Sequence, residues 1–439
     1  MRKAVVPLTL ILVFIAVAGA NPVRISSANF FPYPGPDLPR IYIKNDGSIE
    51  PATAPIERNG DLYKLTGNII LYTIEIQRDN IVLDGSDHIV QGNASWMGYA
   101  SGNNGIILNG RKDVTIKHLN IAQCYTGIRI SKSSDIQVVN NSIANGTSIG
   151  IALQDCTNVL VEDNELVDLL TDLDSPAVSL NGSSNTVKNN RITGSTYGIQ
   201  VEGSSNVISD NRIEVLLPLM LDRADSNTIT RNNISGPPSS SHLPDQNYNG
   251  NEGISLFRNC SNNMISGNNL TGFINQAIRI VEGSNNTIYA NNMGKDEFAI
   301  ELDEGAADNT FYANNFAADS CKIRINNAAG NFWDNGTIGN YWGNYNGSDS
   351  NGDGIGDTPY TIVAYKWDTS AGGDVSFVYD QDNYPLIAPY KFGHDTVTMP
   401  ASGLFVAVLV AALVAAIVIL AGLLLIFTRR KRRRGAQQT

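Results

Sequence analysis

The sequence predicts an all-β protein built as a parallel β-helix, a solenoid of about ten turns. Three observations lead to this prediction. A phrase of about 22 residues recurs along most of the 439-residue chain. Each copy holds short alternating apolar runs separated by Gly, Ser or Asn, which is typical of strands and turns. No copy contains a stretch of ten or more residues with a helical period.

Each copy of the repeat begins with a small residue and Ile, followed by any residue and then Leu or Ile. A few polar residues, an Asn or Asp, an apolar–x–apolar stretch and Asn-x-Ile complete it. A less regular copy starts at Ile81. The regular copies follow at intervals of 20 to 35 residues and open at Gly105, Gly127, Gly150, Ala177, Gly198, Pro218, Gly253, Ala277 and Ala299.

Three short strands per copy fit one turn of a parallel β-helix, whose strands stack about 4.8 Å apart and hydrogen-bond from turn to turn. The apolar residues then point inward. The 50 Asn residues suit the bends, because Asn tolerates left-handed conformations and stacked Asn side chains hydrogen-bond in ladders. A leucine-rich repeat has a similar period, but its regular Leu frame is missing here.

The two ends of the chain predict an exported protein with a membrane anchor. Residues 1–20 carry two basic residues, an apolar run and a small-x-small end, which is typical of a secretory signal peptide. Leu404 to Phe427 contain 24 residues without a charge, enough to cross a bilayer as a helix. The basic run from Arg429 to Arg434 is expected to stay on the cytoplasmic side.

These features predict seven segments. In chain order they are the signal peptide (1–20), a lead-in (21–60), the β-helix repeats (61–330), an aromatic and acidic closing block (331–390), a juxtamembrane linker (391–403), a transmembrane helix (404–428) and a basic tail (429–439). Between the signal peptide and the tail lie 23 basic and 42 acidic residues, a net charge of −19. This charge excludes a nucleic-acid binder that works through a basic surface.

The closing block is the most specific part of the sequence. It reads NFWDNGTIGNYWGNYNGSDSNGDGIGDTPYTI from Asn331 to Ile362, followed by DNYPLIAPY from Asp382 to Tyr390. The repeats resemble those of the right-handed β-helix family of carbohydrate-binding and sugar-hydrolysis type, specifically its NosD-like branch. The closing block resembles that of many archaeal surface β-helix proteins. The resemblance covers roughly Asp61 to Pro389 and implies a right-handed solenoid.

Aromatic residues of the closing block are expected to cover the last turn, because an open turn would expose strand edges and core. They are Trp333, Tyr341, Trp342 and Tyr345.

The sequence also predicts a structural Ca²⁺ site in the closing block, where DSNGDGIGD spans residues 349–357. Oxygen atoms recur at the spacing of a calcium loop, with Gly354 at the sharp turn. The expected ligands are Asp349, Asn351, Asp353, Ile355 and Asp357. Tyr360 replaces the bidentate Glu of an EF-hand, so the segment resembles the looser calcium loops of extracellular repeats. The alternative is an Asp/Gly-rich turn without metal.

The two x positions of Gly-Ile-x-Leu-x point outward and form two polar columns along the solenoid. These columns supply the candidate ligand-binding residues Gln200, Glu202, Asp222, Arg279, Glu301 and Asp303. Glu202 and Asp222 lie on adjacent turns, about 4.8 Å apart in backbone. They are therefore candidates for the carboxylate pair of a retaining glycosidase. The alternative is a solvated strip that holds two acids by chance, and the signatures of pectin-cleaving hydrolases and uronate epimerases are absent.

Two long copies carry their extra residues just before the next copy opens, at Leu169 to Pro176 and Gly236 to Glu252. Both insertions are expected on one edge of the strip, about 14 Å apart, where they would suit recognition.

Copper, with which NosD is associated, needs clustered His, Cys or Met, and the four His are dispersed. The four Cys could be free thiols or could form two disulfides, and the sequence does not decide between these alternatives. Ten Asn-x-Ser/Thr sequons indicate a candidate glycoprotein.

The predicted function is that of a membrane-anchored cell-surface protein whose β-helix face binds glycan or envelope proteins, without catalysis. A polysaccharide lyase or hydrolase acting on the same face is the alternative. A purely structural envelope protein is the second alternative. Glycan binding without product release favours the first, and turnover that is lost in Glu202→Gln or Asp222→Asn favours the enzyme.

Overall fold

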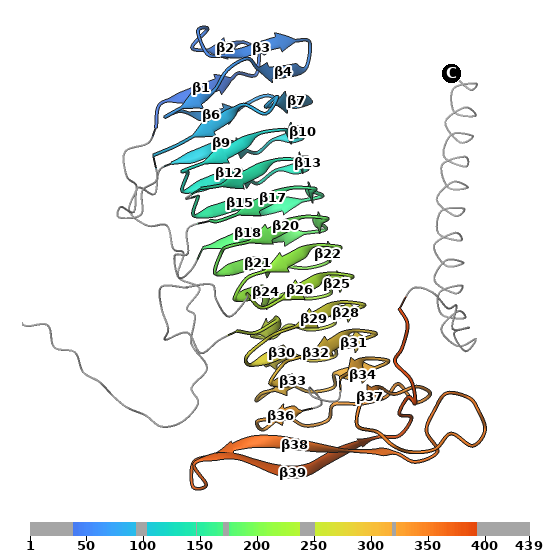
Figure 1. The fold of residues 1–439 in the computed structure, drawn as a ribbon. Helices are drawn as coiled ribbons and strands as arrows, with labels where there is room; N and C mark the ends of the chain where they lie inside the picture. Colours follow the sequence, from blue (N-terminus) through green and yellow to red (C-terminus); the bar gives the residue numbers. More distant parts are fainter. Residues whose placement is uncertain are drawn as a thin grey trace, which may run out of the picture. The chain divides into compact units, whose positions relative to one another are not determined.

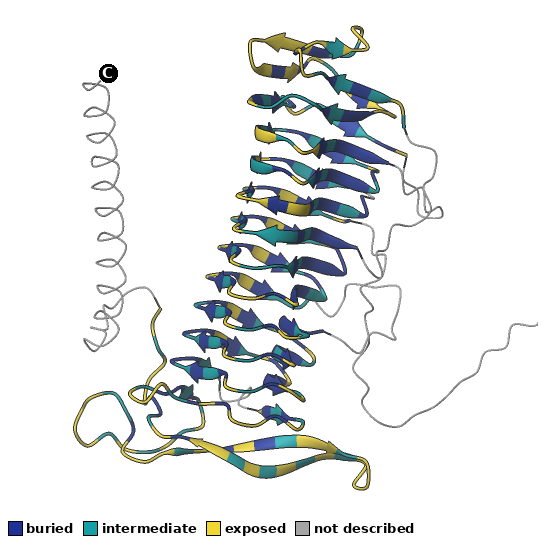
Figure 2. Cartoon of the chain, turned by 180° about the vertical axis from the view of Figure 1, so that it is seen from behind, coloured by how far each residue is buried: buried dark blue, intermediate teal, exposed yellow. Residues whose placement is uncertain are grey.

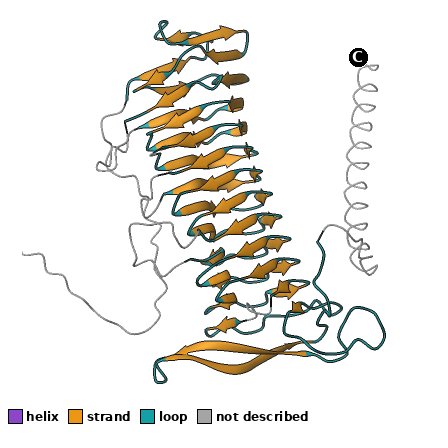
Figure 3. Ribbon diagram, in the orientation of Figure 1, coloured by secondary structure: helices purple, strands orange, loops and turns teal. Residues whose placement is uncertain are grey.

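The computed structural model of the protein describes residues 38–93, 103–145, 147–169, 175–237, 251–317 and 322–392. The expected signal peptide, transmembrane helix and basic tail lie outside these residues, as does most of each long insertion. The described residues up to Tyr390 form one compact unit. This unit is a parallel β-helix of about 11 turns, close to the predicted ten (Figure 1). Strands and turns make up the described residues (Figure 3). Among these residues, no helix is long and apolar enough to span a membrane.

Three stacks of parallel strands form the walls of the solenoid. In the first, which we call the front stack, neighbours pair in parallel from β1 to β38, and β39 adds an antiparallel partner. Its strands are β1 Arg40–Ile43, β6 Thr73–Ile76, β9 Asn104–Asn109, β12 Thr126–Ser131, β15 Ile149–Thr157, β18 Pro176–Ser183, β21 Tyr197–Glu202, β24 Leu217–Asp222, β27 Ile254–Phe257, β30 Gln276–Val281, β33 Phe298–Leu302, β36 Ile323–Ile325, β38 Tyr360–Asp368 and β39 Gly373–Asp382.

The other two walls are the side stack and the back stack. The side stack contains β4 Leu62–Leu65, β7 Ile81–Asp84, β10 Lys112–Lys117, β13 Ser134–Val139, β16 Leu160–Glu162, β19 Thr186–Lys188, β22 Val207–Ser209, β25 Thr228–Thr230, β28 Met264–Ser266, β31 Thr287–Tyr289 and β34 Thr310–Tyr312. The back stack contains β5 Ile69–Ile70, β8 Ile89–Gln91, β11 Asn120–Ala122, β14 Ser142–Ala144, β17 Glu165–Val167, β20 Arg191–Thr193, β23 Arg212–Glu214, β26 Asn233–Ser235, β29 Asn269–Thr271, β32 Asn292–Gly294, β35 Asn315–Phe316 and β37 Tyr341–Trp342. Two short strands pair antiparallel with β1 and β4, namely β2 Ile49–Glu50 and β3 Ile56–Asn59.

The parallel wall begins earlier than the repeats indicate. β1 pairs with β6 so that Ile41 and Ile43 fill the inward positions that Ile and Leu take in later turns. The solenoid therefore starts at Arg40, ahead of the expected start at residue 61. The segment has Arg40 in place of the small residue that opens the repeat phrase, so the phrase does not extend to it although the alternation does.

The register of the front stack confirms the two outward columns. In the first column Gln200 stands between Ser179 and Met220 on the neighbouring strands. In the second, Asn181 stands opposite Glu202. The alternate positions carry Ile, Leu and Val, which are buried along the whole length of the solenoid (Figure 2).

Two ladders of buried Asn side chains run along the bends of the solenoid. In each step the backbone N and the Nδ2 of one Asn donate to the Oδ1 of the Asn one turn further on, at 2.8–3.2 Å. The long ladder comprises Asn141, Asn164, Asn190, Asn211, Asn232, Asn268, Asn291, Asn314 and Asn340. The short ladder comprises Asn185, Asn206, Asn227, Asn263, Asn286, Asn309 and Asn331.

Aromatic rings close the C-terminal end of the core, as the sequence predicts. Trp333 and Trp342 are each only 1% exposed. Trp333 stacks on Phe311 with ring centroids 4.8 Å apart, and Trp342 stacks between Phe316 and Tyr360, at 4.4 Å from each. Stacked rings at these distances continue the core beyond the last apolar turn.

The other two expected cap residues contribute less. Tyr345 is partly buried and packs against the core, whereas Tyr341 is half-buried in β37. The long ladder ends at this cap on Asp382, whose Oδ2 accepts hydrogen bonds from the backbone N of Asn340 at 2.6 Å and from Nε1 of Trp342 at 2.9 Å. Burial raises the pKa of the Asp382 carboxyl to about 6.

Three of the four cysteines are buried free thiols, namely Cys124, Cys156 and Cys260. Burial raises the pKa of the Cys124 thiol to about 12 and that of Cys260 to about 11, so these thiols are unreactive. Cys321 lies outside the described residues.

Candidate functional site

The candidate residues fall into two groups on the outward side of the front stack, with β27 between the groups. The first comprises Gln200, Glu202 and Asp222, on β21 and β24. The second comprises Arg279, Glu301 and Asp303, on or next to β30 and β33.

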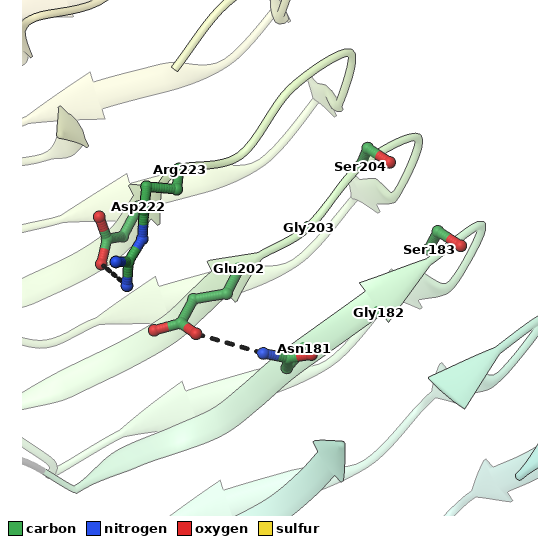
Figure 4. A pocket seen from close by; sticks show the side chains of 8 residues that line it. All are labelled: Asn181, Gly182, Ser183, Glu202, Gly203, Ser204, Asp222 and Arg223. Atoms are coloured by element: carbon green, nitrogen blue, oxygen red, sulfur yellow. Dashed lines mark hydrogen bonds and ion pairs between the residues drawn. The ribbon is translucent and has the colours of Figure 1, made fainter. Parts of the chain in front are cut away.

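A shallow pocket of about 380 Å³ lies at the first group (Figure 4). It forms where three neighbouring front strands end and the chain bends towards the side stack. Its lining residues are Asn181, Gly182, Ser183, Glu202, Gly203, Ser204, Asp222 and Arg223. Polar side chains and bare backbone therefore surround the pocket, without a large apolar side chain.

Two stacked glycines keep the pocket open. Gly182 and Gly203 have φ of 145° and 128°, which side chains rarely adopt. A Cβ on Gly203 would overlap the carbonyl oxygen of Gly182, and one on Gly182 would overlap that of Cys156. The close approach of the turns thus requires glycine, and its absent side chains leave backbone accessible to a ligand.

Glu202 is the carboxylate that faces the pocket. Its Oε2 accepts a hydrogen bond from Asn181 Nδ2 at 3.2 Å, and Gln200 Nε2 lies 3.5 Å from its Oε1. In the part of the chain that the structure describes, no Lys, Arg or His side chain forms an ion pair with Glu202. Its half-buried carboxylate and the neighbouring amides therefore offer acceptors and donors to a ligand rich in hydroxyl groups.

Asp222 has a different environment from Glu202. It is 1% exposed. Arg258 donates two hydrogen bonds to it, from Nε to Oδ1 at 2.7 Å and from Nη2 to Oδ2. Arg223 Nη2 lies 3.4 Å from the same Oδ2. A carboxylate held by two guanidinium groups is a buried ion pair, which suits the positioning of Arg223 at the pocket better than nucleophilic attack.

The second group is a dense ion-pair network centred on Arg279. Its Nη1 binds Glu252 Oε1 at 2.9 Å, and its Nε and Nη2 both lie 2.8 Å from Asp303 Oδ2. Arg324 Nη1 lies 3.6 Å from Glu301 Oε2. These charges are well buried, so their contacts fix the outward side of four adjacent turns.

Glu301 is the most perturbed acid of this network. Burial and the nearby charge of Asp303 raise the pKa of its carboxyl to about 7. Gln276 Nε2 donates to its Oε2, and Asn326 Nδ2 donates to its Oε1 at 3.2 Å and to Asp303 Oδ1 at 2.8 Å. The side chain of Glu301 is 6% exposed, and protein groups occupy both of its oxygens.

The expected calcium loop forms a series of tight turns. Asp349 accepts hydrogen bonds from the backbone N of Gly352 at 2.8 Å and of Gly354 at 2.9 Å. Asp353 accepts one from the backbone N of Ile355 at 2.8 Å. Each acidic side chain thus accepts hydrogen bonds from the backbone turn that follows it, in the manner of an Asx turn.

The last acid of the loop is held by hydroxyl groups. Asp357 Oδ2 accepts hydrogen bonds from Ser350 Oγ at 2.6 Å and Ser348 Oγ at 2.8 Å, which lower the pKa of its carboxyl. Asn351 Nδ2 donates to Asp353 at 2.9 Å. Within the described residues, no group of three or more His, Cys, Asp or Glu side chains is arranged to hold a metal.

Several residues of both groups do not appear among the sequence candidates. Arg324 could have been found, because KIRI begins 23 residues after the copy at Ala299 and continues the same frame. Arg258 stands one position beyond the second column, in a left-handed conformation with φ of 55°. Asp374, which pairs with Arg324 at 2.8 Å, belongs to the closing block, and no repeat pattern points to it.

Two family models match the chain. The model described as right handed beta helix region matches residues 176–353, and this agrees with the observed solenoid. The model described as periplasmic copper-binding protein (NosD) matches residues 80–252. The chain is therefore a right-handed parallel β-helix protein with a NosD-like segment. No curated protein is significantly similar to it.

Solved structures with similar folds share little sequence with this chain. A mutant of the periplasmic alginate epimerase AlgG is 13% identical with a TM-score of 0.42, over 65% of this chain and 71% of the epimerase. A tailspike of E. coli bacteriophage HK620 is 13% identical with a TM-score of 0.41, over 65% and 59%. A DFA-IIIase from Arthrobacter chlorophenolicus is 16% identical with a TM-score of 0.33, over 58% and 65%. The chain thus spans less than two thirds of the tailspike and of the DFA-IIIase.

Proposed function

We propose that this protein is a membrane-anchored cell-surface β-helix protein whose front stack binds glycan without cleaving it. The pocket at Glu202 carries the proposal. It offers an accessible carboxylate, amide and hydroxyl groups and bare glycine backbone side by side, which suits a ligand with many hydroxyl groups. The run from residue 404 to 428 supplies the anchor.

A binding role fits the state of the two acids better than catalysis does. A retaining glycosidase needs two carboxyl groups that both reach the glycosidic bond. Asp222 is almost fully buried and is paired with two arginines, so it is poorly placed to attack a substrate. Glu202 therefore acts alone in the pocket, as a hydrogen-bond acceptor.

Glu301 supports the lyase or hydrolase as a second candidate. A carboxyl with a pKa of about 7 has the proton affinity of a general acid or base near neutral pH. Against this role, its oxygens are occupied by Gln276 and Asn326. Product release from polysaccharides that is lost in Glu301→Gln would support the enzyme.

The test is binding of the full-length chain, in detergent, to immobilised polysaccharides. The host should not attach N-glycans, because Asn181 in the pocket begins a sequon. Glu202→Gln is expected to weaken binding about tenfold, since it removes a charged acceptor. Glu57→Gln, the same change on an exposed side chain of β3, is the matched control. Equal binding by Glu202→Gln and wild type would refute the pocket as the site.

A further inference from the structure

The C-terminal hairpin extends the front stack beyond the last turn. β38 pairs in parallel with β36, with Arg324 beside Tyr365, and β39 pairs antiparallel with β38. Both strands are long, at nine and ten residues. The outward side of the front stack therefore continues onto one side of this hairpin (Figure 1).

The outward side of the hairpin is partly apolar and accessible. Alternation turns Ile362 and Ala364 into the core, where both are fully buried. Val363, Tyr365 and Trp367 of β38 point outward, together with their partners on β39. The exposed fractions are 43% for Val363, 57% for Trp367 and 72% for Val378. We call this surface the hairpin platform, and it consists of Val363, Tyr365, Trp367, Asp374, Ser376 and Val378.

Charged groups hold the hairpin platform against the last turn. Arg324 lies over the ring of Phe298 at 3.8 Å and binds Asp374 Oδ2 at 2.8 Å. The ring of Tyr365 meets that of Phe298 edge to face, with centroids 6.1 Å apart. Lys322 lies 6.0 Å from the Tyr365 ring. These contacts fix the rings before any ligand arrives, so little ordering remains to be done on binding.

Charges of both signs lie at the hairpin platform. Lys322 and Arg324 are basic, Asp374 of the platform is acidic, and Glu301, whose pKa is about 7, is partly ionised at neutral pH. A ligand with a net charge would therefore gain little electrostatic advantage here, although the domain as a whole is acidic. An uncharged ligand with hydroxyl groups can use both signs as hydrogen-bond partners.

We propose that the hairpin platform is a second glycan subsite, where Trp367 stacks on the apolar face of a neutral pyranose and Asp374 and Lys322 bind its hydroxyl groups. This inference rests on the proposed glycan binding and names the class of glycan. A lipid bilayer fits less well, because it would take Arg324, Lys322 and Asp374 out of water. The platform lies five strand spacings from β24, about 24 Å, so a glycan that reaches both sites has several sugar units.

The experiment measures affinity of the full-length chain, in detergent, for mannan, dextran and a β-1,3-glucan, with polygalacturonate as the acidic comparison. Trp367→Ala is expected to weaken binding to a neutral polymer about tenfold, and Trp367→Phe less. Added salt is expected to leave the affinity unchanged. Phe332→Ala removes a ring of similar exposure, 55%, from a position paired with the side stack, and is expected to have no effect. Ligand is also expected to shield Trp367 from acrylamide quenching, a change that is lost in Trp367→Ala.

Each outcome separates the two proposals. Normal affinity in Trp367→Ala with weak binding in Glu202→Gln would overturn the hairpin platform and leave the proposed function standing. Binding of polygalacturonate alone would overturn the neutral class. Failure of the wild-type chain to bind any polymer would overturn both proposals. Weaker adsorption of Trp367→Ala to phosphatidylcholine vesicles, with unchanged glycan affinity, would assign the platform to the membrane.

Discussion

At the bends, the left-handed conformation and the ladder Asn side chain belong to neighbouring residues. The left-handed residue stands one position before every ladder Asn except Asn340, and it varies in type, for example Asp163, Asp210 and Ala290 at φ of 54°, 58° and 56°. The following Asn is required by its side chain, which donates and accepts at once between turns. The expected link between Asn and the left-handed conformation holds at Asn140, Asn189, Asn262 and Asn285, whereas the ladder positions select Asn for its side chain.

The ladder makes a prediction about stability. Asn211→Ala is expected to lower the free energy of unfolding by about 3 kcal/mol, because Asn190 N and Nδ2 and the Val187 carbonyl lose their partners inside the protein. Chemical denaturation of the full-length chain measures this. Asn233→Ala, at an exposed position of the back stack, is the control and is expected to change stability by less than about 0.5 kcal/mol.

A second residue-scale prediction concerns pH. The Asp382 carboxyl has a folded-state pKa of about 6, above its usual 3.8, so the folded state binds more protons between these values. Its contribution to stability is fully present below about pH 4 and is lost as the pH rises through 6, on the order of 2 to 3 kcal/mol. Asp382→Asn is expected to remove this part of the pH dependence, as measured by melting temperature from pH 4 to 7. An unchanged pH profile in the variant would contradict the assignment.

At the scale of elements, the acidic loop is tied to the aromatic cap. Ile355 forms a β-bridge with Leu386, and Gly356 N donates to the Pro385 carbonyl at 2.8 Å. The Tyr345 hydroxyl donates to the Thr358 carbonyl at 2.6 Å. A change in the loop is therefore transmitted to the end of the solenoid.

Calcium binding remains our proposal for this loop. The carboxylates of Asp349 and Asp353 accept hydrogen bonds from backbone donors, and Ca²⁺ would bring them to one centre. We expect calcium to raise the melting temperature, with a gain below the roughly 2.7 kcal/mol reached at a hundredfold excess over Kd. The comparison is millimolar calcium against chelator, for wild type and Asp353→Ala. Equal melting temperatures in both buffers would rule the ion out, and a shift that persists in the variant would place it elsewhere.

At the scale of the whole molecule, stability passes from turn to turn, and the last turn needs a cap. A chain that stops at Gly330 would lose Trp333 and Trp342 and expose the rings of Phe311 and Phe316, both fully buried. We expect this truncated chain to aggregate, because it also exposes open strand edges. Size-exclusion chromatography is the measurement, with the full-length chain as control, and a folded soluble monomer would disprove the capping role.

The repeat phrase predicted most of the solenoid because it is local. Its period sets the turns, and its alternation sets which side chains face the core, so the columns through Gln200 and Glu202 were confirmed in register. The aromatic cap was predicted for the same reason, since Trp333 and Trp342 follow directly on the last repeats. The start of the solenoid at Arg40 was not predicted, because β1 keeps only the alternation of the repeat.

The candidate site depended on partners that no local pattern contains. Arg258 reaches Asp222 from 36 residues further on, and Arg324 reaches Asp374 across 50 residues. The sequence by itself determined the solenoid, its period, its outward columns and the Asn ladders, because each follows from short-range alternation and repetition. Only the tertiary structure decided that Asp222 is paired with two arginines, that Glu202 lines a pocket and that the hairpin extends the front stack. Those facts depend on side chains that the stacking of turns brings together, whatever their separation along the chain.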